Sequence, residues 1–217
     1  YWFEQSTKAL QAFPYHWIIT PEGKELTTLL KESSAITLRY SSPLNSKIGK
    51  ISYHAVYESP SYGFANLGKW SRKNVARGLK NCEVKEISFE RLAEEGYDLQ
   101  RDTLKRQRRN LHFSQNQWQI ICLSARDLEG FKAWGAIIDG KLVASVITFK
   151  MDDYGYMLYQ QSNRDYLDRH VNNALSYVVT NHLLQQSGIR SILYGLHSLD
   201  APPSVDEFKF RMGYTAK

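Results

Sequence analysis

Cysteine is scarce in this chain of 217 residues, and the two that it has, Cys82 and Cys122, stand far apart. Neither belongs to a Cys-x-x-Cys motif, and the six histidines are scattered singly along the sequence. Because a structural zinc site needs clustered Cys and His ligands, this pattern argues against one. Isolated cysteines also suggest reduced thiols, so we expect a cytoplasmic protein.

Long apolar runs, internal repeats and low-complexity segments are absent as well. No run approaches the roughly 20 residues that a helix needs to cross a bilayer. The composition, 42% hydrophobic with 13% aromatic residues, is instead typical of an ordered globular protein. The net charge of +6 favours anionic partners such as phosphates, nucleic acid or an acidic carrier protein, and does not choose among them.

The first 69 residues alternate short extended runs with one helical run. "YHWIIT", "AITLRYS" and "KISYHAVYES" are typical of strands, and Pro21 opens a helix between the first two. A loop rich in Gly and Pro, "PSYGFANLGK", follows at residues 60–69. We therefore place a domain boundary there and expect a partial N-terminal lobe at 1–69 and a main domain at 70–217.

The main domain begins with a basic helix, "WSRKNVARGLKN", at residues 70–81. Val75 and Leu79 lie on one side of it, and Lys73, Arg77 and Lys80 on the other. After a short strand, a helical region extends over 89–129 and carries a second basic face with Arg101 and Lys105. Such faces are either solvated surface or contact surfaces for a negatively charged substrate, and the sequence leaves both open.

The remainder of the chain has a regular order of strands and helices. Residues 131–139 and 141–150 predict an antiparallel hairpin that turns at Asp139-Gly140. A strand at 156–162, a helix at about 168–187 and a strand at 190–197 then form a right-handed crossover, so we expect the two strands to be parallel neighbours. The predicted fold is an α/β (α+β) mixed twisted sheet flanked by helices, with this strand pair splayed near its carboxyl ends.

Polar side chains follow both strands of the expected parallel pair. The first strand ends in Tyr159, Gln160, Gln161 and Ser162, and the second carries Tyr194, Gly195, His197 and Ser198. Ligands of open α/β sheets collect beyond the carboxyl ends of parallel strands, because loops diverge there. We therefore expect a binding site at these ends, although loops are also polar for no functional reason.

The order of these elements, closed by the stretch "FKFRMGY", resembles the GNAT superfamily of acyltransferases. More narrowly it is similar to the Fem-type and BioF2-like acetyltransferase branch, whose members tend to have a basic helix like "SRKNVARGLKN" and a late "FK-x-x-x-G" element. Here the second element is Phe208, Lys209 and Gly213. The resemblance covers roughly 70–217 and implies a GNAT-like fold and transfer of an acyl or aminoacyl group from a thioester or ester donor to an amine acceptor, a small molecule or a peptide.

One feature of the family is missing. Most GNAT enzymes hold the pyrophosphate of coenzyme A on a glycine-rich turn after the Tyr-rich strand, and the corresponding segment here, "NRDYLDRHVNNA", has no glycine. The resemblance therefore leaves three donors open: acyl-CoA, an acyl carrier protein or aminoacyl-tRNA. It implies no metal ion and no cofactor besides these donors.

Acyl transfer to an amine needs a base and a group that stabilises the oxyanion. We expect His197 to be the base, since its ordinary pKa lies nearest neutrality, with Tyr194, Asp206 and Glu207 as second choices. The resemblance implies a substrate-contacting role for Lys209, and we expect Phe208 and Met212 to hold its helix against the sheet. The expected substrate-binding residues are Arg72, Lys73, Arg77, Lys80, Tyr159, Gln161 and Asn172.

Two other functions fit the same sequence. The basic runs "SRKNVARGLK" and "RDTLKRQRR" could belong to a nucleic-acid-binding module, although only Trp70 accompanies them as an aromatic residue and no RNP, KH or helix-turn-helix signature is present. The missing glycines would also suit a GNAT-like scaffold without catalytic activity.

Overall fold

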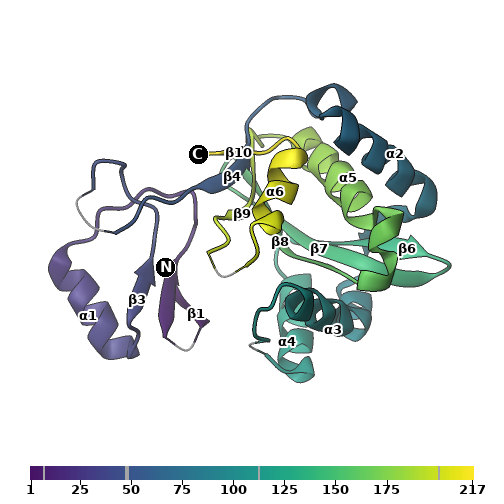
Figure 1. The fold of residues 1–217 in the computed structure, drawn as a ribbon. Coiled ribbons are helices and arrows are strands. Elements are labelled where there is room, and N and C mark those ends of the chain that lie inside the picture. Colours follow the sequence, from purple (N-terminus) through teal and green to yellow (C-terminus); the bar gives the residue numbers. More distant parts are fainter. Residues whose placement is uncertain (7, 47–48, 112, 200) are drawn as a thin grey trace. The chain divides into compact units, whose positions relative to one another are not determined.

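The structure, a computed structural model, describes residues 1–6, 8–46, 49–111, 113–199 and 201–217. The chain forms two compact units, Tyr1–Ser52 and Tyr53–Lys217 (Figure 1). The boundary expected at 69/70 thus lies too far along the chain. The strand β4 (His54–Tyr57), which we had assigned to the first lobe, pairs with two strands of the second unit and belongs to its sheet.

The first unit contains a three-stranded sheet of order β1-β2-β3. Its strands are β1 (Trp2–Ser6), β2 (Ala9–Ala12) and β3 (Thr37–Arg39). The predicted helix after Pro21 is confirmed as α1 (Gly23–Ser33), which connects the parallel strands β2 and β3. The predicted strand at 15–20 is wrong, because these residues make a single bridge, Ile18 to Ser41, and no ladder. The antiparallel pair β1 and β2 was not predicted.

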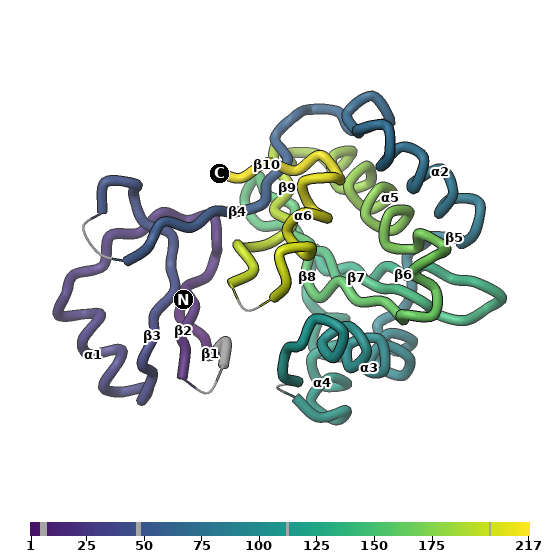
Figure 2. The backbone as a smooth tube through the Cα atoms, in the orientation of Figure 1, coloured from purple at the N-terminus to yellow at the C-terminus, as the bar shows by residue number. Residues whose placement is uncertain are grey.

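The second unit is built on a mixed seven-stranded sheet of order β10-β4-β9-β8-β7-β6-β5 (Figure 2). The predicted hairpin is confirmed as β6 (Lys132–Ile138) and β7 (Lys141–Met151), with positive φ angles at Asp139 and Gly140 that suit the tight turn. The other strands are β5 (Glu83–Ile87), β8 (Tyr154–Ser162), β9 (Ser191–Leu196) and β10 (Thr215–Ala216).

Helices cover both faces of this sheet, as the fold prediction required. On one face lie α2 (Lys69–Asn81) and α5 (Val171–Gln185), and on the other α3 (Phe89–Arg106) and α4 (Gln115–Arg126) (Figure 1). Alternate side chains of β6 enter the two cores: Trp134 and Ala136 face α5, whereas Ala133 and Ile137 face α3. The chain ends with α6 (Ser204–Arg211) and β10, and a 3-10 turn, η1 (Phe64–Asn66), precedes α2.

The crossover between β8 and β9 differs from the prediction in one respect. The expected continuous helix begins as a 3-10 turn, η2 (Arg164–Arg169), and becomes α-helical only at Val171. His170 separates the two in a left-handed conformation, with a φ of 58°. Hydrophobic periodicity does not reveal such a break, because the apolar residues before and after His170 still recur at the three- and four-residue spacing of a helix.

Among the described residues, no helix is long and apolar enough to cross a membrane. The same residues contain no cluster of three or more His, Cys, Asp or Glu side chains that could hold a metal ion.

Candidate active site

The strands β8 and β9 are parallel, as predicted, and they separate toward their carboxyl ends. Their pairing covers Tyr154 to Tyr156 of β8 and Ser191 to Leu193 of β9, and does not continue beyond. Both strands are irregular just beyond these paired residues. The register of β8 against β7 shifts where Tyr159 adopts a φ of 50°, and the register of β9 against β4 shifts next to Gly195, with a φ of 144°. Because a bulge bends its strand, the two irregularities open the gap between the strands.

A cluster of three polar side chains from three elements joins the two strands across this gap. The Tyr194 hydroxyl on β9 donates a hydrogen bond to Gln160 Oε1 on β8. Ser176 Oγ on α5 lies 3.2 Å from the same Gln160 oxygen and 3.1 Å from the Tyr194 hydroxyl. Burial raises the pKa of Tyr194 above its ordinary value, and its hydrogen bonds with Ser176 and Gln160 do not offset this. The hydroxyl therefore stays protonated at neutral pH and serves as a donor rather than as a base.

Sequence reasoning found only part of this cluster. The sequence predicts Tyr194 as a site residue, and it places Gln160 among the polar strand ends without indicating a role for it. Ser176 was missed, although a hydroxyl on the otherwise apolar side of a helix is a usable signal. It is fully buried next to Leu175, which belongs to the core.

Lys209 lies beside the end of β9, and its ammonium group is almost fully enclosed. Lys209 Nζ is 2.6 Å from Asp206 Oδ1, and it also donates to the carbonyl oxygen of Leu196 at 3.0 Å and to Ser198 Oγ at 3.1 Å. As predicted, Phe208 packs against the core and Met212 is fully buried, so the helix is fixed and Lys209 is turned away from bulk solvent. The structure thus gives Lys209 protein partners that the sequence did not indicate.

Asp206 accepts hydrogen bonds at both of its oxygens. Besides Lys209, Asp206 Oδ1 accepts from Ser198 Oγ at 2.8 Å, and Asp206 Oδ2 accepts from the Tyr53 hydroxyl and the Ser198 amide, both at 2.9 Å. Burial by itself would raise the pKa of Asp206, but the hydrogen bonds from Lys209 and Ser198 outweigh it and lower the pKa to about 2. A carboxylate held this way is a weak base, so Asp206 is poorly suited to take a proton from an amine.

His197 stands at the same end of β9. Its ring stacks on the ring of Tyr53, with 4.2 Å between the ring centres and 18° between the planes, and its backbone amide donates to the Tyr53 carbonyl. Tyr53 therefore connects His197 to Asp206, since the hydroxyl of the same tyrosine donates to that carboxylate. Sequence reasoning missed Tyr53, which is more than a hundred residues away in the chain.

Gln161, Tyr159 and Glu207 are among the predicted site residues that lie outside the cluster of Tyr194, Gln160 and Ser176. Gln161 is buried on the opposite side of β8, where its Nε2 donates to Gln100 on α3. Tyr159 packs its ring edge-on against Phe113 and Trp118. Glu207 is exposed and pairs with Arg211 at 2.8 Å.

The segment after β8, where a GNAT enzyme would hold a pyrophosphate, is closed by protein groups. The amide of Arg164 donates to Asp102 Oδ2 at 2.7 Å, and the Arg164 guanidinium pairs with Asp102 Oδ1 at 2.7 Å. The next amide, that of Asp165, donates to the Asn163 side chain. The Asp102 carboxylate thus occupies the Arg164 amide and the Asn163 side chain occupies the Asp165 amide, so these residues do not fit the pyrophosphate of coenzyme A.

Asn172, another predicted binding residue, lies next to this closed segment. Its Nδ2 donates to Ser162 Oγ at 3.0 Å, and the same hydroxyl accepts from Arg106 on α3. Asn172 therefore helps to connect α5 with the end of β8 and with α3.

The four predicted basic residues Arg72, Lys73, Arg77 and Lys80 are all exposed on α2. The helix packs against α5 through Gly78, where an added Cβ would lie 2.5 Å from the carbonyl oxygen of His170. Its first turn adjoins α6, since Ser71 Oγ donates to the carbonyl of Arg211. The basic residues thus line the outer side of α2 and do not enter the gap between β8 and β9.

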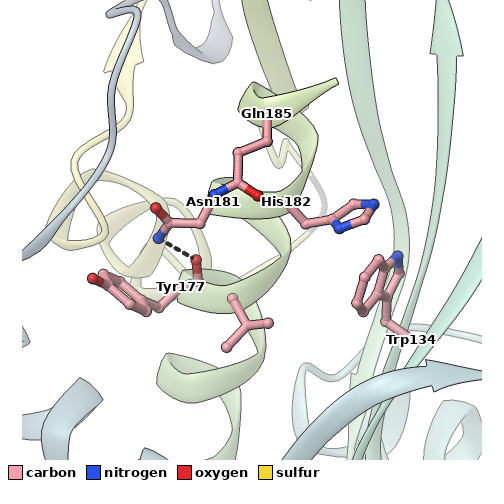
Figure 3. A pocket seen from close by; sticks show the side chains of 6 residues that line it. Trp134, Tyr177, Asn181, His182 and Gln185 are labelled. Carbon is pink, nitrogen blue, oxygen red and sulfur yellow. Dashed lines mark hydrogen bonds between the residues drawn. The ribbon is translucent and has the colours of Figure 1, made fainter. Parts of the chain in front are cut away.

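A separate cavity of about 330 Å³ lies between α5 and β6. It is lined by Trp134 of β6 and by side chains of α5, among them Tyr177 and His182, whose ring faces Trp134 in Figure 3. Because β7 and β8 separate β6 from β9, this cavity is distinct from the gap that holds Tyr194.

Comparison with solved structures identifies the fold. The structure titled "Crystal structure of FemX" superimposes with a TM-score of 0.66 at 11% identity, covering 81% of this chain and 62% of that one. The C-terminal domain of a putative lysylphosphatidylglycerol synthetase from Agrobacterium fabrum gives 0.64 at 11% identity, covering 100% of this chain and 77% of that one. These likenesses confirm the predicted fold: the chain has the fold of the FemX structure.

A conserved protein of unknown function from Staphylococcus epidermidis is also similar, with a TM-score of 0.57 at 11% identity, covering 96% of this chain and 81% of that one. The present chain spans less than two thirds of the FemX structure. No protein-family model and no curated protein matches the sequence. At these identities the likeness concerns the fold alone.

Proposed function

We propose that this chain is an acyltransferase, which moves an acyl or aminoacyl group from an ester or thioester donor to an amine acceptor. The observation that carries the proposal is the gap between β8 and β9, which opens at two strand irregularities and contains the protonated Tyr194 hydroxyl. The GNAT-like fold supports it, as do the names of the similar proteins, one of them a putative lysylphosphatidylglycerol synthetase.

The chemistry assigns each group a role. The amine nitrogen attacks the carbonyl carbon, a C–N bond forms, the C–O or C–S bond to the carrier breaks, and the carrier leaves with a proton. The Tyr194 hydroxyl turns its one proton from Gln160 Oε1 to the carbonyl oxygen of the substrate, and donates there as negative charge develops. His197, just after the end of β9, takes the proton of the amine. Lys209 acts as a positioning residue, since its contacts with Leu196 and Ser198 fix the end of β9.

The donor that we propose is a carrier other than coenzyme A. The Asp102 carboxylate closes the segment that would have to bind a pyrophosphate, and repulsion between like charges disfavours a phosphate there. An acyl carrier protein or an aminoacyl-tRNA needs no such pyrophosphate site, so we propose that one of these two is the acyl donor.

A donor panel tests the proposal. The protein is incubated with acetyl-CoA, an acylated acyl carrier protein or aminoacyl-tRNA, together with lysine- and alanine-containing peptides, and mass spectrometry measures the acylated peptide. Native mass spectrometry shows which donor is retained. We expect transfer from a carrier other than coenzyme A. Transfer from acetyl-CoA alone contradicts the donor assignment, and a retained donor without transfer to any amine favours a non-catalytic scaffold.

Tyr194→Phe is the diagnostic variant in this assay. Loss of one hydrogen-bond donor to the oxyanion lowers turnover by roughly a hundredfold or more, while the core keeps its shape. Tyr97→Phe is the matched control, because Tyr97 lies on α3 and packs against the core on the opposite face of the sheet. Equal activity of the two variants would exclude Tyr194 from the reaction.

A further inference from the structure

The helix α2 carries most of the excess charge of the protein. The chain has 28 Lys and Arg against 22 Asp and Glu, a net charge of +6. The 13 residues of α2 contain five basic residues and no acidic one: Lys69, Arg72, Lys73, Arg77 and Lys80. All five are exposed, and none forms an ion pair within the part of the chain that the structure describes. One helix thus contributes five of the six net positive charges.

The arrangement of these charges disfavours the helix unless an anion binds to it. Lys69, Lys73 and Arg77 follow each other at intervals of four residues, so they form a row with steps of about 6 Å along the outer side. Like charges at this spacing repel each other. Other surface helices pair their arginines with acids: Arg101 with Asp98 on α3, and Arg211 with Glu207 on α6. The row on α2 has no such compensation.

Aromatic rings are exposed at the start of the same helix. Trp70 is 74% exposed, and the ammonium group of Lys73 lies 5.7 Å from the centre of its ring, which holds the indole in place. Next to it is a groove of about 320 Å³, lined by Lys69 and Trp70 of α2 and by Phe210 and Arg211 of α6. Phe210 is 38% exposed. Two rings and two cations, of which Arg211 is paired with Glu207, therefore line one groove.

We infer that the outer side of α2 and this groove bind single-stranded nucleic acid. A row of cations follows a phosphodiester backbone, and exposed rings stack on unpaired bases, a combination typical of single-strand binding. A membrane surface fits less well, because insertion needs one continuous exposed apolar face. The large apolar side chains exposed on α2, Trp70 and Leu79, are nine residues apart and so lie on opposite sides of the helix, and Val75 is buried. A base-paired duplex offers no free base faces for Trp70. This inference goes beyond the proposed acyl transfer and does not depend on it.

Fluorescence anisotropy with labelled 12-residue oligo(U) RNA tests the inference, with oligo(dT) of equal length to distinguish RNA from DNA. We expect binding that weakens with salt, with a log–log slope of about −0.7 for each phosphate neutralised. Lys73→Gln with Arg77→Gln should reduce that slope by about 1.4 and weaken binding at least tenfold. Trp70→Ala should weaken binding by roughly 5- to 150-fold, the range for loss of one stacked base.

The matched control is Arg101→Gln with Lys105→Gln, which removes two exposed cations at the same spacing from α3. We expect this control to bind oligo(U) within about twofold of the unmodified protein, since distant surface charges are screened. Circular dichroism confirms that each variant is folded. Equal loss in the two double variants, or no effect of Trp70→Ala, would overturn the inference. Binding of a blunt RNA duplex with the same affinity as oligo(U) would also overturn it. The inference is wrong, too, if oligo(U) does not bind and the protein instead binds phosphatidylglycerol vesicles through the α2 residues changed in the double variant.

Discussion

The Lys209 ammonium lies 2.6 Å from the Asp206 carboxylate, and the two side chains are only 7% and 9% exposed. A buried pair of this kind adds little stability by itself, because desolvation of both charges offsets their attraction. The pair instead fixes the end of β9 and the residue that follows, through the hydrogen bonds of Lys209 to Leu196 and Ser198 and of Ser198 to Asp206.

Removing one charge of this pair should therefore destabilise the protein strongly. Lys209→Met leaves the buried Asp206 carboxylate without its cation, and we expect the free energy of unfolding to fall by about 3–5 kcal/mol. The double variant with Asp206→Asn should recover a large part of this loss. Urea unfolding measures both, and Arg211→Met, which breaks an exposed pair, serves as the control with a change of about 0.5 kcal/mol or less. A small effect of Lys209→Met would contradict the buried pair.

The Asp206 carboxylate should make the free energy of unfolding depend on pH. The pKa of Asp206 is about 2 in the folded protein and about 3.9 in an unfolded chain, so its contribution is complete above pH 4 and is lost as the pH falls through 2. At about 1.36 kcal/mol per pKa unit this amounts to about 2.5 kcal/mol. Urea unfolding measures the free energy of unfolding of the unmodified protein and of Asp206→Asn between pH 7 and pH 2. We expect the difference in favour of the unmodified protein to disappear as the pH falls. A constant difference across this range would show that Asp206 does not titrate as described.

The contact of α2 with α5 should depend on Gly78. An added Cβ would lie 2.5 Å from the backbone oxygen of His170 and 2.9 Å from the Ala174 side chain. Gly78→Ala improves helix propensity by about 1 kcal/mol, but we expect the forced separation of the helices to cost more, for a net loss of about 1–3 kcal/mol. At Gly68, at the start of the same helix, an added Cβ would meet nothing within 4 Å, so Gly68→Ala should change the free energy of unfolding by only a few tenths of a kcal/mol. Thermal unfolding compares the two, and a stabilised Gly78→Ala would argue against the close crossing.

Both cysteines should be unreactive in the folded protein. Burial raises the pKa of Cys82 to about 11 and that of Cys122 to about 12, so almost no thiolate is present at neutral pH. Alkylation by iodoacetamide at pH 8, followed by intact mass, should be slow in buffer and complete in urea. Rapid labelling of Cys122 without denaturant would mean that α4 opens readily.

Local signals in the sequence determined much of this protein. The Asp139-Gly140 turn, the basic helix at 70–81 and the crossover from β8 to β9 each depend on residues close together in the chain, where period and turn chemistry suffice. The polar strand ends also indicated the right region for a site, because the carboxyl ends of parallel strands follow from the crossover itself.

Only the tertiary structure decided which of those polar residues meet. Gln160 and Gln161 are neighbours in sequence, yet the bulge at Tyr159 turns the first toward Tyr194 and leaves the second among the residues of α3. Tyr53 reaches Asp206 because β4 joins the sheet beside β9, a pairing that no local pattern encodes. The environment of Lys209 follows from the same assembly. The sequence alone would allow its ammonium group to lie in solvent, but β9, the loop after it and α6 bury the group. A buried charge needs polar partners, and here Asp206 provides one.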